Sequence, residues 1–309
     1  MKVAFMGTPD FAVPCLKVLI DLKYDIVGVF CQPDKPKGRT QEIVPPPVKA
    51  LAVEYGLPVF QPVTLKNGAG RAILEEIKPD VVIVTAYGKI LPSDFLEYPK
   101  YGCINIHGSL LPKYRGSAPI QWAVLNGDEE AGVTSMQMDE GIDTGDMLLT
   151  EKVKVGENET AEELFSELSE LGAKVLVKTL TALENDELVP IKQNEDFATY
   201  VGMLSKDMSN IDWGKTAWEV HNQIRGLYSW PGASTQLAGK TLKVHKSIMS
   251  TAKGNGISGS VVKSDGVITV CCGDNNCVDL IEIQLEGKKR MKSEDFLRGR
   301  KIEKGTVLG

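Results

Sequence analysis

The residues best suited to chemistry, Asn105 and His107, alternate with two isoleucines in the short segment 103–107. Successive side chains of a β-strand point to opposite faces, so an extended segment would place the amide and the imidazole on one face. A glycine precedes this segment and another follows it, which lets other backbone or a ligand approach closely. The same alternation also suits a half-buried edge strand in which His107 is only a structural residue.

A carboxylate that could join this pair comes from the loop 138–146, where four acids and two glycines occupy nine residues. Taken alone, this loop is an acidic hairpin turn. Taken with Asn105 and His107, its Asp143 completes a set suited to moving an acyl-level carbon from one nitrogen to another. The amide and imidazole N–H groups would donate hydrogen bonds to the oxyanion that amine attack creates. Asp143 would hold a proton-relaying water and stabilise an imidazolium, so no covalent nucleophile is needed.

Strands and helices alternate along the first part of the chain, and these elements must position the three residues. Buried strands are predicted from apolar runs and period-two patterns at 2–7, 26–31, 57–60, 81–85, 103–107, 133–138 and 147–155. Helices are predicted after Asp10, which would act as an N-cap, and at 48–55, 68–78, 117–126 and 160–183. This order predicts an α/β fold with a doubly wound, mostly parallel sheet.

One edge of the predicted sheet is the expected ligand site, because doubly wound sheets bind ligands beyond the carboxyl ends of their strands. The loops at that edge are 7–10, 31–47, 85–92, 107–117 and 138–146. The first strand ends in Gly-Thr-Pro-Asp, and neither a Gly-x-Gly-x-x-Gly fingerprint nor a P-loop follows it. A nicotinamide dinucleotide (NAD) is therefore not expected as a cofactor.

The pattern changes after residue 184. Residues 185–205 are polar and irregular, as in a linker, and separate a domain of residues 1–184 from one of residues 206–309. The second domain has a predicted helix at 215–227 and short strands at 234–237, 241–249, 259–264, 266–271 and 278–285. Short strands between glycine turns suggest a small OB-like β-barrel, a fold that often binds nucleic acid.

The formal net charge of −6 is unevenly distributed between these two parts. Residues 206–309 carry 16 Lys and Arg against 11 Asp and Glu, a net charge of +5, which leaves −11 for residues 1–205. A basic second part on an acidic body is typical of a protein with a polyanionic partner. A solvated, lysine-rich surface would have the same composition.

The composition, with 42% hydrophobic and 25% charged residues, is that of a soluble globular protein. No membrane span is expected, because no apolar run approaches the ~20 residues that a span needs. Six scattered cysteines without a CxxC pair indicate reduced thiols in a cytoplasmic protein. A metal site at Cys271, Cys272 and Cys277 is the less favoured alternative, since a hairpin turn lies between them. A monomer without a metal is expected.

Several stretches of this sequence resemble the folate-dependent formyltransferases. The longest is 105–116, Asn-Ile-His-Gly-Ser-Leu-Leu-Pro-Lys-Tyr-Arg-Gly, followed further along the chain by Asp143. Shorter matching stretches lie at 6–11, 32–34, 86–88, 136–139 and 141–145. The resemblance extends over nearly the whole chain and is greatest to the members that formylate methionyl-tRNA, which have a C-terminal barrel after a linker.

This resemblance implies an N-terminal Rossmann-like formyltransferase fold and an OB-like tRNA-binding domain. The formyl donor would be 10-formyltetrahydrofolate. The acceptor would be the free amino group of methionine on initiator methionyl-tRNA, and the product N-formylmethionyl-tRNA for translation initiation. The catalytic roles of the family fall on Asn105, His107 and Asp143. Folate contacts are implied for Ser109, Leu110, Leu111 and Pro112, and by position for Ala86, Tyr87, Gly88, Ile90, Leu91 and Asp139.

The segment 32–47 resembles a family insertion that grips the acceptor end of tRNA. Lys35, Lys37 and Arg39 supply the basic cluster expected there, whereas Gln41 and Glu42 stand where family members often carry basic residues. Phosphate contacts supply most nucleic-acid affinity, so this departure would weaken or redistribute the grip. Basic C-terminal residues would follow the tRNA backbone, namely Lys288, Lys289, Arg290, Lys292, Arg298, Arg300 and Lys301.

Two other functions fit part of the sequence. A formyltransferase with a small amine acceptor, such as a sugar nucleotide or glycinamide ribonucleotide, would share the three catalytic residues. Such an acceptor requires neither the insertion nor a basic second domain. A nucleic-acid-binding module with an inactive folate domain would not need Asn105, His107 and Asp143. Formylation of methionyl-tRNA is therefore the favoured function.

Overall fold

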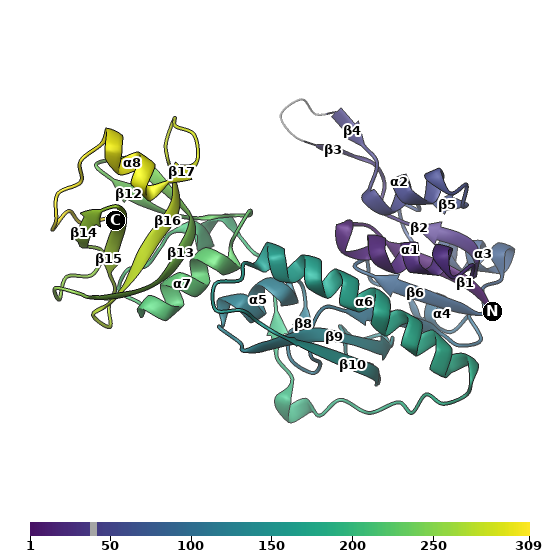
Figure 1. The fold of residues 1–309 in the computed structure, drawn as a ribbon. Helices are drawn as coiled ribbons and strands as arrows, with labels where there is room; N and C mark the ends of the chain where they lie inside the picture. The colour runs from purple at the N-terminus through teal and green to yellow at the C-terminus, as the bar shows by residue number, and fades with distance from the viewer. Residues whose placement is uncertain (38–41) are drawn as a thin grey trace. The chain divides into compact units, whose positions relative to one another are not determined.

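The computed structural model describes residues 1–37 and 42–309, which form two compact units (Figure 1). The first unit comprises residues 1–116, 132–153 and 165–200. The second comprises residues 117–131, 154–164 and 201–309. Each unit is thus assembled from segments that are separated in the sequence.

The first unit contains a seven-stranded sheet in the order β10-β9-β7-β6-β1-β2-β5. Its strands are β1 (Lys2–Gly7), β2 (Asp25–Phe30), β5 (Val59–Phe60), β6 (Val81–Thr85), β7 (Cys103–His107), β9 (Glu130–Gln137) and β10 (Met147–Lys154). Its helices are α1 (Val13–Asp21), α2 (Pro47–Glu54), α3 (Ala69–Ile77), α4 (Ser93–Leu96) and most of α6 (Ala161–Glu184). Short elements complete it: β3 (Lys35–Lys37), β4 (Glu42–Val44), β8 (Arg115–Gly116) and a 3-10 turn at Glu195–Phe197.

Neighbouring strands are parallel from β5 through β2, β1 and β6 to β7, and the β7–β9 pair is antiparallel. The prediction of a mostly parallel sheet is therefore confirmed. The chain builds outward from β1 to β2 and β5 and then returns to the other side of β1 through β6. This reversal between β1 and β6 is the position at which doubly wound sheets bind ligands.

Strand β7 lies inside the sheet between β6 and β9, and all five of its residues are buried. The alternative of a half-buried edge strand is therefore wrong. Ile106 faces helix α6, since a Cβ placed on Gly172 of that helix would lie 3.3 Å from the Ile106 side chain. Cys103 belongs to the apolar cluster on the opposite face, which includes Leu74 of α3 and Phe95 of α4. By the period-two rule, Asn105 and His107 share the face of Cys103.

The second unit contains a six-stranded antiparallel sheet in the order β12-β13-β16-β15-β14, with β17 paired to β16. Its strands are β12 (Ala233–Leu237), β13 (Lys240–Lys253), β14 (Val261–Asp265), β15 (Val267–Cys271), β16 (Asn276–Leu285) and β17 (Met291–Lys292). Its helices are α5 (Pro119–Leu125), α7 (Ala217–Gly226) and α8 (Ser293–Gly299), and it also holds a 3-10 turn at Lys206–Ser209. Strand β11 (Tyr200–Val201) lies where the two units meet in the sequence. Register shifts interrupt the long β13–β16 pairing, as they do where a strand bends in a small barrel. The predicted C-terminal antiparallel β domain is confirmed.

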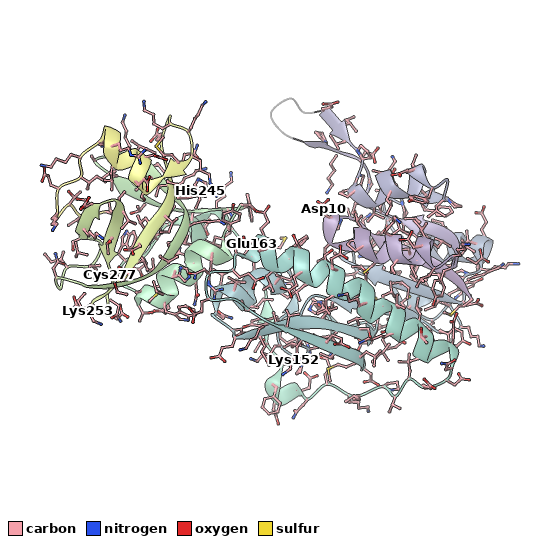
Figure 2. The ribbon with its side chains drawn as sticks, in the orientation of Figure 1. Asp10, Lys152, Glu163, His245, Lys253 and Cys277 are labelled. Carbon is pink, nitrogen blue, oxygen red and sulfur yellow. The ribbon has the colours of Figure 1, made fainter. Side chains whose placement is uncertain are left out.

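Two local predictions are wrong. Asp10, labelled in Figure 2, is not an N-cap but lies inside a 3-10 turn (Asp10–Ala12) that precedes α1, and the N-cap Pro9 has no side chain able to accept a hydrogen bond. The segment 32–47 is not a plain loop, because β3 and β4 pair as an antiparallel hairpin. Both strands have three residues, and strands this short carry no periodic signal.

No helix in the described part of the chain combines the length and the apolar character that a membrane-spanning segment needs.

Candidate active site

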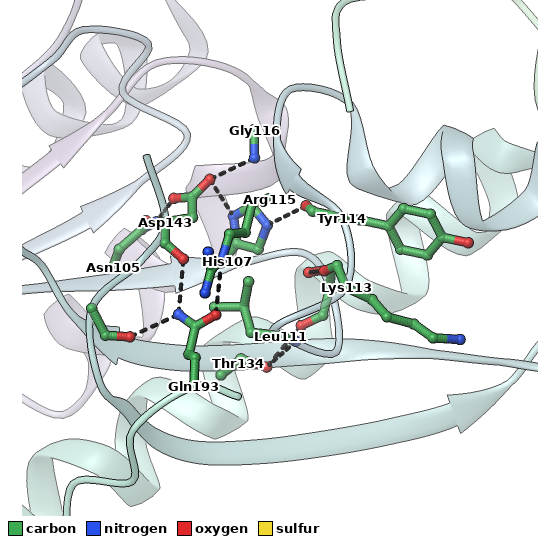
Figure 3. A network of polar contacts seen from close by, with 12 residues as sticks. Asn105, His107, Leu111, Lys113, Tyr114, Arg115, Gly116, Thr134, Asp143 and Gln193 are labelled. Atoms are coloured by element: carbon green, nitrogen blue, oxygen red, sulfur yellow. Dashed lines mark hydrogen bonds and ion pairs between the residues drawn. The ribbon is translucent and has the colours of Figure 1, made fainter. Parts of the chain in front are cut away.

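Asn105 lies at the middle of β7 and His107 at its carboxyl end, both on one face of the strand. Asp143 reaches them from the loop between β9 and β10 (Figure 3). The Asn105 Nδ2 donates to the Asp143 Oδ1 over 3.3 Å. The His107 Nδ1 lies 3.6 Å from the Asp143 Oδ2. The structure therefore brings together the three residues for which the sequence predicts catalytic roles.

The Asp143 side chain is fixed by a third partner, the backbone N–H of Gly116, which donates to Oδ2 over 2.8 Å. Its backbone has a φ of 54°, a left-handed conformation that is uncommon for a residue other than glycine. Such a conformation persists only where surrounding contacts determine it. The loop therefore holds the carboxylate in a place that the chain alone would not favour.

The hydrogen bonds of His107 identify the nitrogen that carries the proton. Its Nε2 lies 2.9 Å from the carbonyl oxygen of Tyr114, and a carbonyl can only accept. Nε2 is therefore the protonated nitrogen, and in the neutral ring the Nδ1 lone pair faces Asp143. This changes the interpretation of the sequence, because the neutral ring has no N–H left to donate to an oxyanion. Nδ1 is instead placed to accept a proton.

The loop that follows β7 is braced by its own polar groups. The Ser109 hydroxyl donates to the Lys113 carbonyl over 2.6 Å, and the Thr134 hydroxyl of β9 donates to the Ser109 carbonyl over 2.8 Å. The backbone N–H of Leu111 donates to the Thr134 hydroxyl over 3.3 Å. Ser109 and Leu111 are buried, and Pro112 is half-buried. The Leu110 side chain packs beside Gly132.

A second group of polar residues, which the sequence did not reveal, lies behind Asp143. The amide nitrogen of Gln193 donates to the Asp143 carbonyl over 2.8 Å and to the Gly145 carbonyl over 2.7 Å. The Nε of Arg115, a residue with 0% exposure, donates to the Gln193 Oε1 over 3.0 Å. Arg115 also forms a two-pronged ion pair with Glu195, over 2.9 and 2.7 Å, and donates to the Tyr200 hydroxyl over 2.8 Å.

The Arg115–Glu195 pair has electrostatic consequences for both partners. The hydrogen bonds from Arg115 lower the pKa of the Glu195 carboxyl, and those to Glu195 raise the pKa of Arg115 above its ordinary value. The Arg115 guanidinium and the Glu195 carboxylate are therefore both charged near neutral pH. The one sequence signal for this cluster is Arg115 itself, which with Lys113 is one of two cations in the loop 108–116.

At the switch point between β1 and β6, three loops are tied together by polar contacts. The Thr8 hydroxyl and the Gln32 amide both donate to the Tyr87 carbonyl, over 3.2 and 3.0 Å. The Tyr87 side chain and Leu91 are buried in the apolar cluster of this face. The Tyr87 hydroxyl has no hydrogen-bond partner among the described residues, and burial raises the pKa of Tyr87 to about 12.

The remaining predicted ligand contacts are exposed. Ala86 and Gly88 have φ values of 47° and 81°, and Ile90 is 73% exposed. Asp139 is also exposed, and its Oδ1 accepts from the Gly141 N–H and the Thr144 hydroxyl within its own loop.

Two of the predicted tRNA contacts lie on the β3–β4 hairpin, and the basic C-terminal residues lie in the second unit. Lys35 is exposed on β3, Lys37 ends the same strand, and Arg39 lies outside the described residues, as does Gln41. Within residues 1–37 and 42–309, no group of three or more His, Cys, Asp or Glu side chains is arranged to hold a metal ion. Cys271 and Cys277 are directly opposed on β15 and β16, across the turn that the sequence predicts.

The fold and the three converging side chains define a class of protein. Residues 1–180 match the formyl transferase family, and residues 203–301 match the formyl transferase C-terminal domain. The chain belongs to the formyl transferase family. Within that family, it is 49% identical over 311 residues to the methionyl-tRNA formyltransferase of Alkaliphilus oremlandii, with all of both chains covered. It is 47% identical over 309 residues to that of Caldanaerobacter subterraneus subsp. tengcongensis, again with both chains covered in full.

Solved structures share the fold at low sequence identity. An N-formyltransferase from Helicobacter canadensis, in complex with folinic acid and dTDP-3-aminofucose, has a TM-score of 0.71 at 22% identity, covering 91% of this chain and 98% of that one. The methionyl-tRNA formyltransferase from Clostridium thermocellum has a TM-score of 0.57 at 19% identity, covering 82% of this chain and 95% of that one.

Proposed function

We propose that this chain transfers the formyl group of 10-formyltetrahydrofolate to the free amino group of methionine on initiator methionyl-tRNA. The observation that carries the proposal is the convergence of Asn105, His107 and Asp143 in a chain whose full-length relatives are methionyl-tRNA formyltransferases. The reaction would take place in the cytoplasm. Residues 1–184 would supply the catalytic domain, 185–205 the linker, and 206–309 the tRNA-binding domain.

The three residues divide the work of amine attack on a formyl carbon. Asn105 has two N–H groups, of which one bonds to Asp143, leaving the other to stabilise the oxyanion that develops on the formyl oxygen. The His107 Nδ1 accepts the proton that the attacking amine must lose. The Asp143 carboxylate, 3.6 Å away, then stabilises the imidazolium. The same proton can pass on to the departing nitrogen, directly or through a water held by Asp143.

The loops at the switch point are where a folate would bind. Ala86 and Gly88 are exposed at the carboxyl end of β6, so their backbone groups are open to the donors and acceptors of a pterin ring. The loop of Ser109, Leu110, Leu111 and Pro112 is held close to the catalytic residues by Thr134. The folate supplies the formyl carbon, and the chain supplies its orientation and the proton transfers.

A tRNA acceptor is favoured over a small amine by the charge of the second part of the chain. Residues 206–309 carry a net charge of +5. The β3–β4 hairpin carries the exposed Lys35 opposite Val44, which is 38% exposed, and Ile43, which is 69% exposed, opposite Pro36. An exposed cation and an exposed apolar residue on a protruding hairpin suit contact with a nucleic-acid end, where phosphates and unstacked bases are both available.

The test is a formylation assay with initiator and elongator methionyl-tRNA side by side, and an amino sugar nucleotide as the small-amine comparison. We expect formylation of the initiator tRNA, with a KM that rises steeply with ionic strength because phosphate contacts release counterions. Asn105→Ala, His107→Ala and Asp143→Ala should each abolish turnover while the protein stays folded. Turnover of the sugar nucleotide alone would overturn the proposal, as would normal turnover in His107→Ala.

A further inference from the structure

The contacts of Gln193 extend the active site beyond the residues that meet substrate. We propose that Gln193 is a positioning residue for catalysis, which holds the Asp143 loop in its active geometry, and that Arg115 sets the orientation of the Gln193 amide. This inference rests on the proposed function, because it concerns the carboxylate that stabilises the imidazolium.

Gln193 is the group that ties down the Asp143 backbone. Its amide nitrogen bridges two carbonyl oxygens of one loop, those of Asp143 and Gly145, over 2.8 and 2.7 Å (Figure 3). The residue is 9% exposed, so water competes poorly for these bonds. Both N–H groups of the amide are thereby used on the loop that carries the carboxylate.

The loop needs such a restraint because Asp143 has a φ of 54°. Without an external restraint, a residue other than glycine would relax out of this conformation. The carboxylate is held from the front by the Gly116 N–H and the Asn105 amide, while the backbone is held from behind by Gln193. Losing the rear contact frees the loop to carry the carboxylate away from His107.

Arg115 determines which way the Gln193 amide points. Its Nε–H can only donate, so the Gln193 oxygen must face Arg115 and the NH₂ group must face the loop. The outer nitrogens of the guanidinium both donate to Glu195, and one of them also donates to the Tyr200 hydroxyl. Arg115 also precedes Gly116, whose N–H binds the Asp143 carboxylate. Arg115 is thus connected to both restraints on the loop, through Gly116 to the Asp143 carboxylate and through Gln193 to the loop carbonyls.

The test compares wild-type protein with Gln193→Met and Gln193→Glu in single-turnover and steady-state formylation of initiator methionyl-tRNA. Methionine keeps the size of the side chain without its hydrogen bonds. Glutamate keeps an acceptor for Arg115 and faces the two loop carbonyls with oxygen instead of NH₂. Displacing a catalytic group by about 1 Å can cost about 100-fold, so we expect kcat to fall about 10- to 100-fold, with each KM within about two-fold of wild type.

A second arm separates positioning from a general loss of stability. In an Asp143→Asn background, Gln193→Met is expected to lower the residual rate by less than about two-fold, because the group on which it acts is gone. The matched control is Gln223→Met, since the Gln223 amide also bridges two backbone carbonyls, those of Met208 and Asn210, each over 2.8 Å. This control loses two amide-to-carbonyl bonds of the same kind without contacting the Asp143 loop, and it should keep its kcat.

The outcomes are distinct. Lack of formylation by the wild-type protein would refute the proposed function rather than this inference. Active wild type with unchanged kcat in both Gln193 variants would refute the inference. An equal loss of rate from Gln193→Met in the Asp143→Asn background, or an equal loss of kcat in Gln223→Met, would also refute it.

Discussion

Replacing Asp143 by asparagine isolates the electrostatic part of the mechanism. The change removes the negative charge that faces the His107 Nδ1 and leaves a side chain of nearly the same size. One amide oxygen still accepts from the Gly116 N–H. The Asn105 amide, however, loses its acceptor, because the NH₂ group of the new asparagine replaces the Oδ1 of Asp143. The expected result is a folded protein with a large loss of kcat and little change in KM.

The magnitude follows from the distance between the charges. For unit charges 3.6 Å apart, an effective dielectric constant of about 20 gives about 4.6 kcal/mol of attraction. Both side chains are mostly buried, with 8% and 16% exposure for His107 and Asp143, so screening by solvent is limited. A proton half transferred in the transition state would realise about 2.3 kcal/mol, or about 50-fold in rate, and full transfer would give about 2,000-fold.

The assay is single-turnover formylation of methionyl-tRNA at saturating folate, with circular dichroism as the check on folding. Asp146→Asn is the control, because it makes the same change at the end of the same loop. It is expected to stay within about two-fold of wild type, since no interaction with the catalytic pair is lost. A rate for Asp143→Asn within about five-fold of wild type would contradict the imidazolium mechanism.

Two further changes test the scaffold. Gly145→Ala would place a Cβ only 1.7 Å from the backbone oxygen of Gln137, which cannot yield as a side chain would, so we expect a loss of about 3 kcal/mol or more and a Tm several degrees lower by calorimetry. His221 is buried, with Nε2 bonded to the Glu157 carbonyl and Nδ1 to the Ser247 hydroxyl, and burial lowers its pKa. The folded state therefore resists a proton that the unfolded state takes up below about pH 6.5, so the free energy of unfolding should fall as pH drops from about 7 to about 5. Urea unfolding of His221→Gln should show a weaker dependence on pH, and an unchanged slope would contradict this assignment.

Much of the sheet could be predicted because its sequence signals are local. Strands β6 and β7 have the bounds that the sequence predicts, since a continuous apolar run and a strict period-two pattern are both typical of strands. The pattern also places Asn105 and His107 on one face. Glycines and acids mark the loop of Asp143, and parallel strands bring such loops to one edge of the sheet.

The supporting residues could not be predicted because nothing local marks them. Arg115 and Gln193 are 78 positions apart, and Gln193 lies in an irregular segment without periodicity. Hydrogen bonds between distant loops depend on backbone positions that emerge only when the sheet has formed. The proposed cap at Asp10 failed for a related reason, since the chain enters α1 through a 3-10 turn.

The dependence of the Asp143 loop on Gln193 bears on how relatives of this chain are recognised. A scan for the three proposed catalytic residues would accept any gene product that keeps Asn105, His107 and Asp143 at their spacing. A copy that had lost Gln193 or Arg115 would pass that scan while its carboxylate no longer faced the imidazole. An inactive copy can therefore keep the three signature residues. The residues at positions 115 and 193 give a way to separate such pseudoenzymes from active members of the family.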